Sequence, residues 1–269
     1  MNKSHADQVS FFEKSFNISI KDDYDRWSQF IEIFERRNLA AHGSLKVNDR
    51  YLENCKKAGC KNLGEIGDQL LVTVEYLQSS IDVLIEFGML LALSAWQKQF
   101  PRSILESFGA VVEVSYSLIK DNHPEVAARL LEYGIKVKSK GADEEKIKMM
   151  IVNLAISYKA SGDNDRSISL IDQTDWSASP PQFKLCAAAL KEDVNKSISL
   201  LEAAKVSDGL SLWEIREWPA FRWIVKNDEF KSACERIFGE ALSPVKIATD
   251  KKVSEEVEKK DAVKIIDSI

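Results

Sequence analysis

Residues 153–173, NLAISYKASGDNDRSISLIDQ, decide the fold of most of this chain. Two sets of residues in this stretch have helical spacing: the first is Leu154, Ala155 and Tyr158, and the second is Ser167, Ile168 and Ile171. Gly162 and Asp163, which separate the two sets, are typical of a turn. The stretch therefore predicts two short helices joined by a tight turn, with Tyr158 filling the gap between them.

A weaker copy of this hairpin follows in residues 183–204, FKLCAAALKEDVNKSISLLEAA. Corresponding positions lie thirty residues apart: Ser197, Ile198, Leu201 and Ala204 follow Ser167, Ile168, Ile171 and Thr174. The hairpins resemble tetratricopeptide repeats, in which small residues let helices pack closely. We therefore expect a helical array over 101–242. Residues 104–119 and 124–137 would form a degenerate unit, and the aromatic stretch 212–239 would close the array.

The composition also favours helices. The 269 residues are 45% hydrophobic and 29% charged, but they include only 11 glycines and 6 prolines, too few turn formers for an all-β sandwich or barrel. We expect an all-α protein with a helical bundle over 1–100, followed by the array. Because 37 basic and 42 acidic side chains give a net charge of -5, binding to nucleic acid would require a local basic patch.

The expected environment is the cytoplasm, with neither a membrane nor a metal involved. The first ten residues, MNKSHADQVS, are polar and do not resemble a signal peptide. The longest apolar run, 87–96, is about half of the roughly 20 residues that a membrane span needs. Four cysteines without a C-x-x-C pair and three histidines make a zinc cluster improbable, so we expect reduced, mostly buried thiols and no cofactor.

Three amphipathic segments predict the N-terminal bundle. Residues 22–37 form one helix, stopped near Gly43, and residues 51–57 form a short one capped by Asn48 or Asp49. A long helix is expected over 67–99, ended by Pro101. Its predicted apolar stripe consists of Leu70, Leu71, Val74, Leu77, Ile81, Leu84, Ile85, Leu91 and Ala95. Antiparallel packing with the segment around Phe11, Phe12 and Phe16 would complete the core.

The last segment, 243–269, carries six lysines and six acidic residues. This composition predicts a solvated, charged tail. Val253, Val257, Ala262 and Ile265 leave open a short docking helix as the alternative.

The corner at 35–43, ERRNLAAHG, combines residue types suited to catalysis. If the helix continues to this corner, Asn38 and His42 share a face, and the flexible Arg37 can reach the same side. Arginine binds phosphate through a fork of donors, and histidine exchanges protons near neutral pH. Residues 36–61 hold seven basic and two acidic side chains, so the corner is locally cationic. These features indicate phosphodiester chemistry.

The string RNLAAH at residues 37–42 resembles the R-x(4–6)-H motif of HEPN domains, over a region of about residues 1–100. The resemblance implies a metal-independent endoribonuclease that works as a pair of chains, in a toxin or antiviral setting. His42 would act on the 2′-hydroxyl or the leaving oxygen, Arg37 would stabilise the charge on phosphorus, and Asn38 would orient one of them. Arg36 is the alternative arginine. Expected RNA-binding residues are Arg36, Lys46, Arg50, Lys56 and Lys57.

One chain supplies one suitable histidine, because His5 lies in a polar segment and His123 precedes a helix at Pro124. Cleavage by the 2′-oxygen uses a proton acceptor and a proton donor on opposite sides of phosphorus, which predicts a homodimer through the N-terminal domain. The competing hypothesis is a binding scaffold, in which the array holds a protein or peptide and the bundle only dimerises. Arg37 would then pair with Glu35 or Asp25, and His42 would cap the corner.

Overall fold

The computed structural model describes residues 4–42, 45–136 and 143–242. Throughout these residues the chain is helical, as expected, and the only β-type pairing is an isolated bridge between Lys46 and Gln69. The predicted tail at 243–269, the helix stop at Gly43 and the end of the helix predicted to reach Val137 lie outside the described residues.

The N-terminal part contains four helices in the described residues, and two of them begin later than predicted. They are α1 (His5–Phe16), α2 (Trp27–Ala41), α3 (Asp49–Lys57) and α4 (Val74–Gln99). The α3 prediction is confirmed, including its cap, because Asn48 accepts a hydrogen bond from the backbone of Tyr51. Residues 21–26 form turns before α2, so its predicted start at Asp22 is wrong.

The predicted start of α4 at Gly67 is also wrong. Gly59, Gly64 and Gly67 adopt positive φ angles, which interrupt a helix at little cost for glycine. The segment before α4 is held by backbone hydrogen bonds instead, from Val47 to Asp68 and from Leu70 to Leu45. The helix begins only after Thr73, whose side chain accepts from the backbone of Tyr76.

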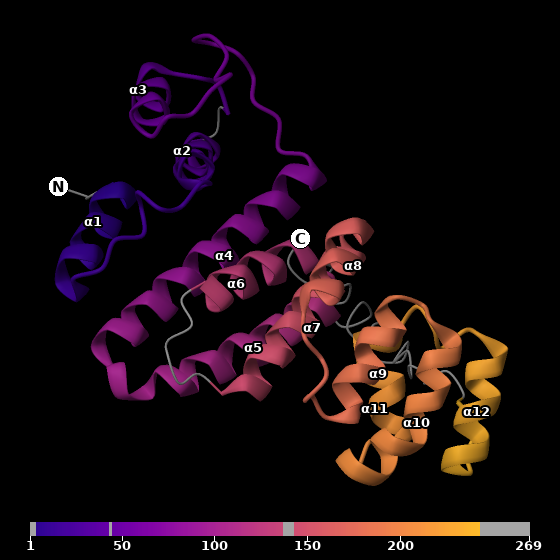
Figure 1. The fold of residues 1–269 in the computed structure, drawn as a ribbon. Coiled ribbons are helices and arrows are strands. Elements are labelled where there is room, and N and C mark those ends of the chain that lie inside the picture. Colours follow the sequence, from indigo (N-terminus) through magenta and orange to yellow (C-terminus); the bar gives the residue numbers. More distant parts are fainter. Residues whose placement is uncertain (1–3, 43–44, 137–142, 243–269) are drawn as a thin grey trace, which may run out of the picture.

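Aromatic residues of α2 and α4 form the core of the N-terminal part. Phe87 of α4 packs against Trp27, Phe30 and Tyr24, with ring centroids 4.1–5.9 Å apart. In Figure 1, α2 is viewed nearly along its axis whereas α4 runs across the picture, so the two helices cross steeply and the antiparallel arrangement is not found. A smaller core joins α2 to α3 through Leu39, Val47, Tyr51 and Cys55.

The predicted apolar stripe of α4 faces outward over most of its length. Its exposed members are Val74 at 77%, Leu77 at 50%, Ile81 at 47% and Leu84 at 38% exposure. The buried face instead carries Ser80, Val83, Glu86, Phe87 and Leu93. Glu86 can be buried there because Arg26 pairs with it at 2.9 Å. The core assignment is therefore wrong for the four exposed residues and for Leu71, which is 70% exposed, whereas Leu70, Ile85 and Leu91 pack against the cores. An apolar surface remains uncovered in the described chain.

The described C-terminal part consists of two short 3-10 helices and several α-helices packed on one another. They are η1 (Pro101–Ser103), α5 (Ile104–Lys120), α6 (Pro124–Lys136), α7 (Glu144–Ala160), α8 (Asn164–Gln173), α9 (Pro181–Leu190), α10 (Val194–Asp208), α11 (Leu212–Glu217), η2 (Pro219–Phe221) and α12 (Asp228–Phe238). The turn predicted at Gly162 and Asp163 is confirmed between α7 and α8.

Three helix pairs are joined by the same kind of turn. Asn122, Gly162 and Glu192 adopt positive φ angles, each two residues before the next helix begins. The backbone N–H of the following residue bonds five positions back in each turn, from His123 to Leu118, from Asp163 to Tyr158 and from Asp193 to Ala188. These bonds satisfy carbonyls at the helix ends. The common turn favours an internal repeat, whose identity as a tetratricopeptide repeat stays a prediction.

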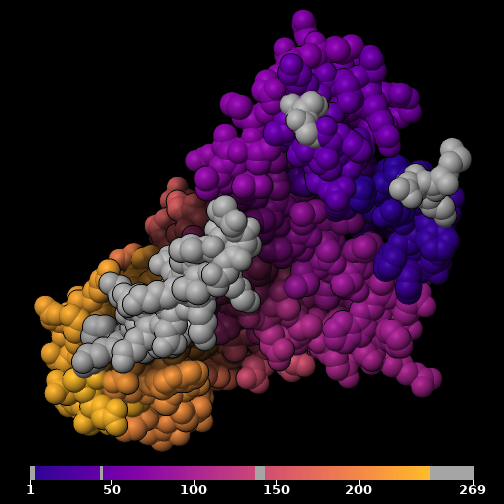
Figure 2. Space-filling model, turned by 180° about the vertical axis from the view of Figure 1, so that it is seen from behind, coloured from indigo at the N-terminus to yellow at the C-terminus, as the bar shows by residue number. Residues whose placement is uncertain are grey.

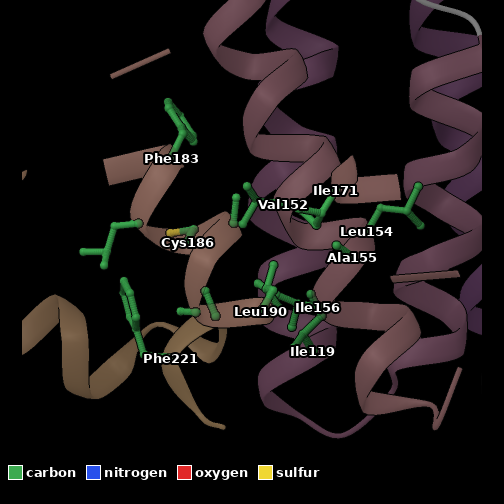
Figure 3. Close-up of a cluster of buried hydrophobic side chains, with 14 of the residues drawn as sticks. Ile119, Val152, Leu154, Ala155, Ile156, Ile171, Phe183, Cys186, Leu190 and Phe221 are labelled. Carbon is green, nitrogen blue, oxygen red and sulfur yellow. The ribbon is translucent and has the colours of Figure 1, made fainter. Parts of the chain in front are cut away.

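The main core lies among α5, α6, α7, α9 and η2. Figure 3 shows side chains of this core, with Ile156 of α7 near Ile119 of α5 and Leu190 of α9, and Val152 one turn away on α7. Phe183, Cys186 and Phe221 extend this core toward η2. The expectation of reduced, mostly buried cysteines is confirmed, because all four thiols are free and Cys55, Cys186 and Cys234 are buried. Burial raises the pKa of Cys234 to about 12.

The molecule is elongated, with the N-terminal helices at one end and α9 to α12 at the other (Figures 1 and 2). Helix α4 belongs to both parts, because Val83 and Phe87 join the N-terminal core and Leu93 joins the main core. By length and composition alone, it is also the one helix of the described chain that could cross a membrane.

Candidate functional site

The end of α2 brings together the three residues of the predicted catalytic motif. The helix continues to Ala41, and the His42 backbone N–H donates to the Asn38 carbonyl over 3.2 Å, so Asn38 and His42 share a face as expected. Arg37 points from another side of α2, but its Nη1 reaches the Asn38 Oδ1 at 3.4 Å. The guanidinium of Arg37 therefore contacts the amide of Asn38, and His42 follows one helical turn later.

All three side chains are accessible to a ligand. Arg37 and His42 are exposed, and Asn38 is half-buried. Neither Asp25 nor Glu35 forms an ion pair with Arg37, and Asp25 instead pairs with Arg129 of α6 at 3.1 Å. Within the part of the chain that the structure describes, the His42 ring has no hydrogen bond or ion pair. Both groups are thus available to an anionic substrate.

Arg36, the alternative arginine, is held inside the N-terminal part. Its guanidinium pairs with Glu32 at 2.7 Å, donates to the Leu71 carbonyl at 2.8 Å and lies over the Tyr76 ring. Glu32 also accepts from the hydroxyls of Tyr51 and Tyr76. Burial and the hydrogen bond to Glu32 raise the pKa of the Tyr51 hydroxyl. This cluster ties α2, α3 and α4 together and leaves the Arg36 side chain only 18% exposed.

The other predicted RNA-binding residues lie on or just before α3. Lys46, Arg50, Lys56 and Lys57 are all exposed. Lys57 is partly neutralised, because it pairs with Glu53 at 2.6 Å. Tyr51 and Cys55 face α2, so the basic side chains of α3 lie on its outward side. Lys46, Arg50, Lys56 and Lys57 are thus the exposed basic residues that follow His42 most closely in the described chain.

His5 is the feature that the sequence analysis missed. Its ring stacks on Phe34 of α2 with centroids 3.7 Å apart, and it lines a cavity of about 390 Å³ with Glu35 and Lys57. Burial lowers the pKa of His5; Glu35 opposes this and Arg37 reinforces it. The sequence offered only a weak signal for this cavity. Glu35, which lines it, lies two helical turns before His42 and therefore on the same face of α2.

The remaining candidates have structural partners. His123 binds Asp82 of α4 at 2.7 Å, next to the start of α6. No group of three or more histidine, cysteine, aspartate or glutamate side chains in the described residues could hold a metal ion. The tryptophans do not all enter the core: Trp218 and Trp223 pack against it, whereas Trp213 is 65% exposed. Trp213 therefore lies outside the core of the closing stretch 212–239.

Comparison with known proteins finds no family model, no curated protein and no solved structure that matches this chain.

Proposed function

We propose that this protein is a metal-independent endoribonuclease with its catalytic site at the end of α2. The observation that carries the proposal is the contact of the Arg37 guanidinium with Asn38, one helical turn from an exposed His42. A guanidinium and an imidazole at the same helix end suit a phosphodiester, because the first binds phosphate oxygens and the second transfers protons.

Each residue has a distinct role in this proposal. His42 exchanges a proton with the 2′-hydroxyl or with the leaving oxygen. Arg37 stabilises the negative charge that develops on phosphorus, as charged donors do at such centres. Asn38 holds the guanidinium in place through its Oδ1. Lys46, Arg50 and Lys56 would hold the RNA backbone, whereas Arg36 serves the fold in view of its internal contacts.

A second histidine is needed on the opposite side of phosphorus, which supports a homodimer. His5 stacks on Phe34, eight residues before His42, and these positions lie about 12 Å apart along a helix axis. His5 is also partly enclosed in its own cavity beside Phe34 and Glu35, so we do not assign it as the second proton carrier. A second copy of His42 is therefore the proposed partner.

The outer face of α4 is the proposed contact between the two copies. Val74, Leu77, Ile81, Leu84, Gly88 and Leu91 follow one another at alternating steps of three and four residues. This is the spacing of a coiled-coil seam, which pairs with another helix. A Cβ added at Gly88 would meet nothing within 4 Å, so a partner helix has room to approach closely. A two-fold pair of α4 helices would cover the uncovered apolar stripe.

The C-terminal helices are the proposed regulatory region of a cytoplasmic nuclease in antiviral defence or growth arrest. Arg129 of α6 contacts Asp25, just before α2, and it lies 3.7 Å from Glu86 of α4. Glu86 in turn pairs with Arg26, the residue that precedes α2. A ligand that moved α6 would therefore act on the helix that carries Arg37 and His42.

Cleavage of a mixed RNA pool in EDTA tests the proposal. The wild-type protein should cut the RNA, and His42→Ala and Arg37→Ala should each slow cutting by roughly 100-fold or more. Arg102→Ala removes an exposed arginine outside the site and should leave the rate unchanged. If the wild type leaves the RNA intact, even after addition of cell lysate as a source of activators, the enzyme proposal fails.

A further inference from the structure

A cavity of about 320 Å³ lies between α5, α7 and α11, away from the proposed nuclease site. It opens beside Trp213, which is 65% exposed. Its size is at the lower end of the range for ligand sites, which suits a single side chain better than a large organic molecule. Three glutamates line the cavity, and its lining contains neither lysine nor arginine.

Asn153 of α7, which lines the cavity, has a side-chain oxygen without a hydrogen-bond donor in the described residues. The side chain is buried, and its Nδ2 donates to Ser115 Oγ at 3.3 Å and to the Val112 carbonyl at 3.5 Å. Ser115 itself donates to the Val112 carbonyl, so the amide must turn its NH₂ group toward these two acceptors. Its Oδ1 is buried and has no hydrogen-bond partner in the described residues, and Asn153 is one of the residues that line the cavity. Buried acceptors of this kind are normally satisfied.

The residues that line the cavity favour the binding of a positively charged group. Glu113 is exposed and forms no ion pair in the described chain, whereas Glu217 pairs with Lys120 at 3.0 Å. Tyr116, Trp213 and Trp218 add three aromatic rings to the lining. A cation over such rings is attracted by their negative faces, most strongly for tryptophan. Carboxylate, ring faces and an unpaired carbonyl oxygen all suit a cation that carries N–H groups.

We propose that this cavity binds an arginine or lysine side chain of a peptide from a partner protein. The cationic group lies against Glu113 and the aromatic rings, on the side of the cavity that Asn153 lines. The exposed ring of Trp213 supports the residues that flank the basic side chain. The proposal is independent of the nuclease site, because the cavity shares no residue with α2.

Titration of the full chain with short peptides tests this assignment. The probes are Ac-Gly-Ser-Arg-Ser-Gly-NH2 and the same peptide with lysine, citrulline or glutamate at the centre. Citrulline matches arginine in shape but has no charge. Tryptophan fluorescence and the NMR signals of the Asn153 side-chain amide report binding. We expect saturable changes with the arginine and lysine peptides, and none with the citrulline and glutamate peptides.

Two surface variants should weaken binding without affecting the fold. Glu113→Gln and Trp213→Ala should each raise the Kd of the arginine peptide roughly threefold to tenfold. Glu202→Gln removes an exposed carboxylate from α10 and should leave the Kd unchanged. The proposal is overturned if the citrulline peptide binds as tightly as the arginine peptide, if the two variants bind like the wild type, or if the basic peptides cause no change at millimolar concentration.

Discussion

Arg36 and Arg37 are neighbours in sequence with different surroundings. Arg36 is held by Glu32, the Leu71 carbonyl and the Tyr76 ring, whereas Arg37 is exposed and its guanidinium contacts Asn38. The sequence alone admits both arginines, because Arg36 and Arg37 each satisfy the spacing of the motif to His42. The contacts of Arg36 with Leu71 and Tyr76, which are distant in sequence, give the two arginines different roles.

The two arginines should therefore differ in their effect on stability. Arg36→Ala removes an ion pair and leaves Glu32 without its cation, so we expect the free energy of unfolding to fall by about 1–3 kcal/mol. Arg37→Ala should change it by no more than about 0.5 kcal/mol, as surface substitutions do. Urea denaturation of both variants measures the difference. Equal stabilities for the two variants would contradict the structural role of Arg36.

His5 should make stability depend on pH. Burial lowers its pKa below 6.5 in the folded protein, so the unfolded chain binds more protons in the range just below that value. The free energy of unfolding therefore rises with pH through this range and falls on acidification. His5→Gln should lose less stability than the wild type between pH 7.5 and pH 5.5 in urea denaturation. Equal losses would show that His5 is not desolvated.

At the scale of elements, the helices were easier to predict than the faces they bury. The alternating three-and-four spacing predicts an apolar face on α4, but it does not say what covers that face. The buried side includes Ser80 and Glu86, which no hydrophobic pattern would select, and Arg26 makes the burial of Glu86 possible from sixty residues away. The glycines before Val74 set the helix start through positive φ angles that the sequence only suggests.

If α4 pairs two copies, a charge on its outer face should separate them. Leu84→Glu places a carboxylate in the middle of the seam, so sedimentation should show a dimeric wild type and a monomeric variant with unchanged helix content. Leu105→Glu is the matched control, because Leu105 is 39% exposed on α5 and Leu84 is 38% exposed. A monomeric wild type, or a Leu84→Glu variant that stays dimeric, would rule out this interface.

At the scale of the whole molecule, α4 joins the two parts. It contributes Phe87 to one core and Leu93 to the other, and Arg129 of α6 pairs with Asp25 across 104 positions of sequence. Sequence patterns record local periodicity, so the thirty-residue correspondence of the hairpins could be predicted. The pair of Arg129 and Asp25 could not, because no local pattern links the two residues. The cavity around Asn153 was missed for the same reason, since its lining comes from four helices.

Because both cores share α4, the described parts should unfold together. We expect one transition in urea, with the same midpoint by far-ultraviolet circular dichroism and by tryptophan fluorescence. Trp27 reports on the N-terminal core, and Trp176, Trp218 and Trp223 report on the main core. Two separated transitions would mean that α4 does not couple the parts.

The chemical nature of the cut ends tests the central claim most directly. Attack by the 2′-oxygen on phosphorus leaves a 2′,3′-cyclic phosphate and a 5′-hydroxyl, with His42 as proton carrier and no metal required. Mass spectrometry of RNA cut in EDTA should find these ends with the wild type and lose them with His42→Ala. Ends with a 3′-hydroxyl and a 5′-phosphate, or the same cutting by His42→Ala, would contradict a catalytic site at the end of α2.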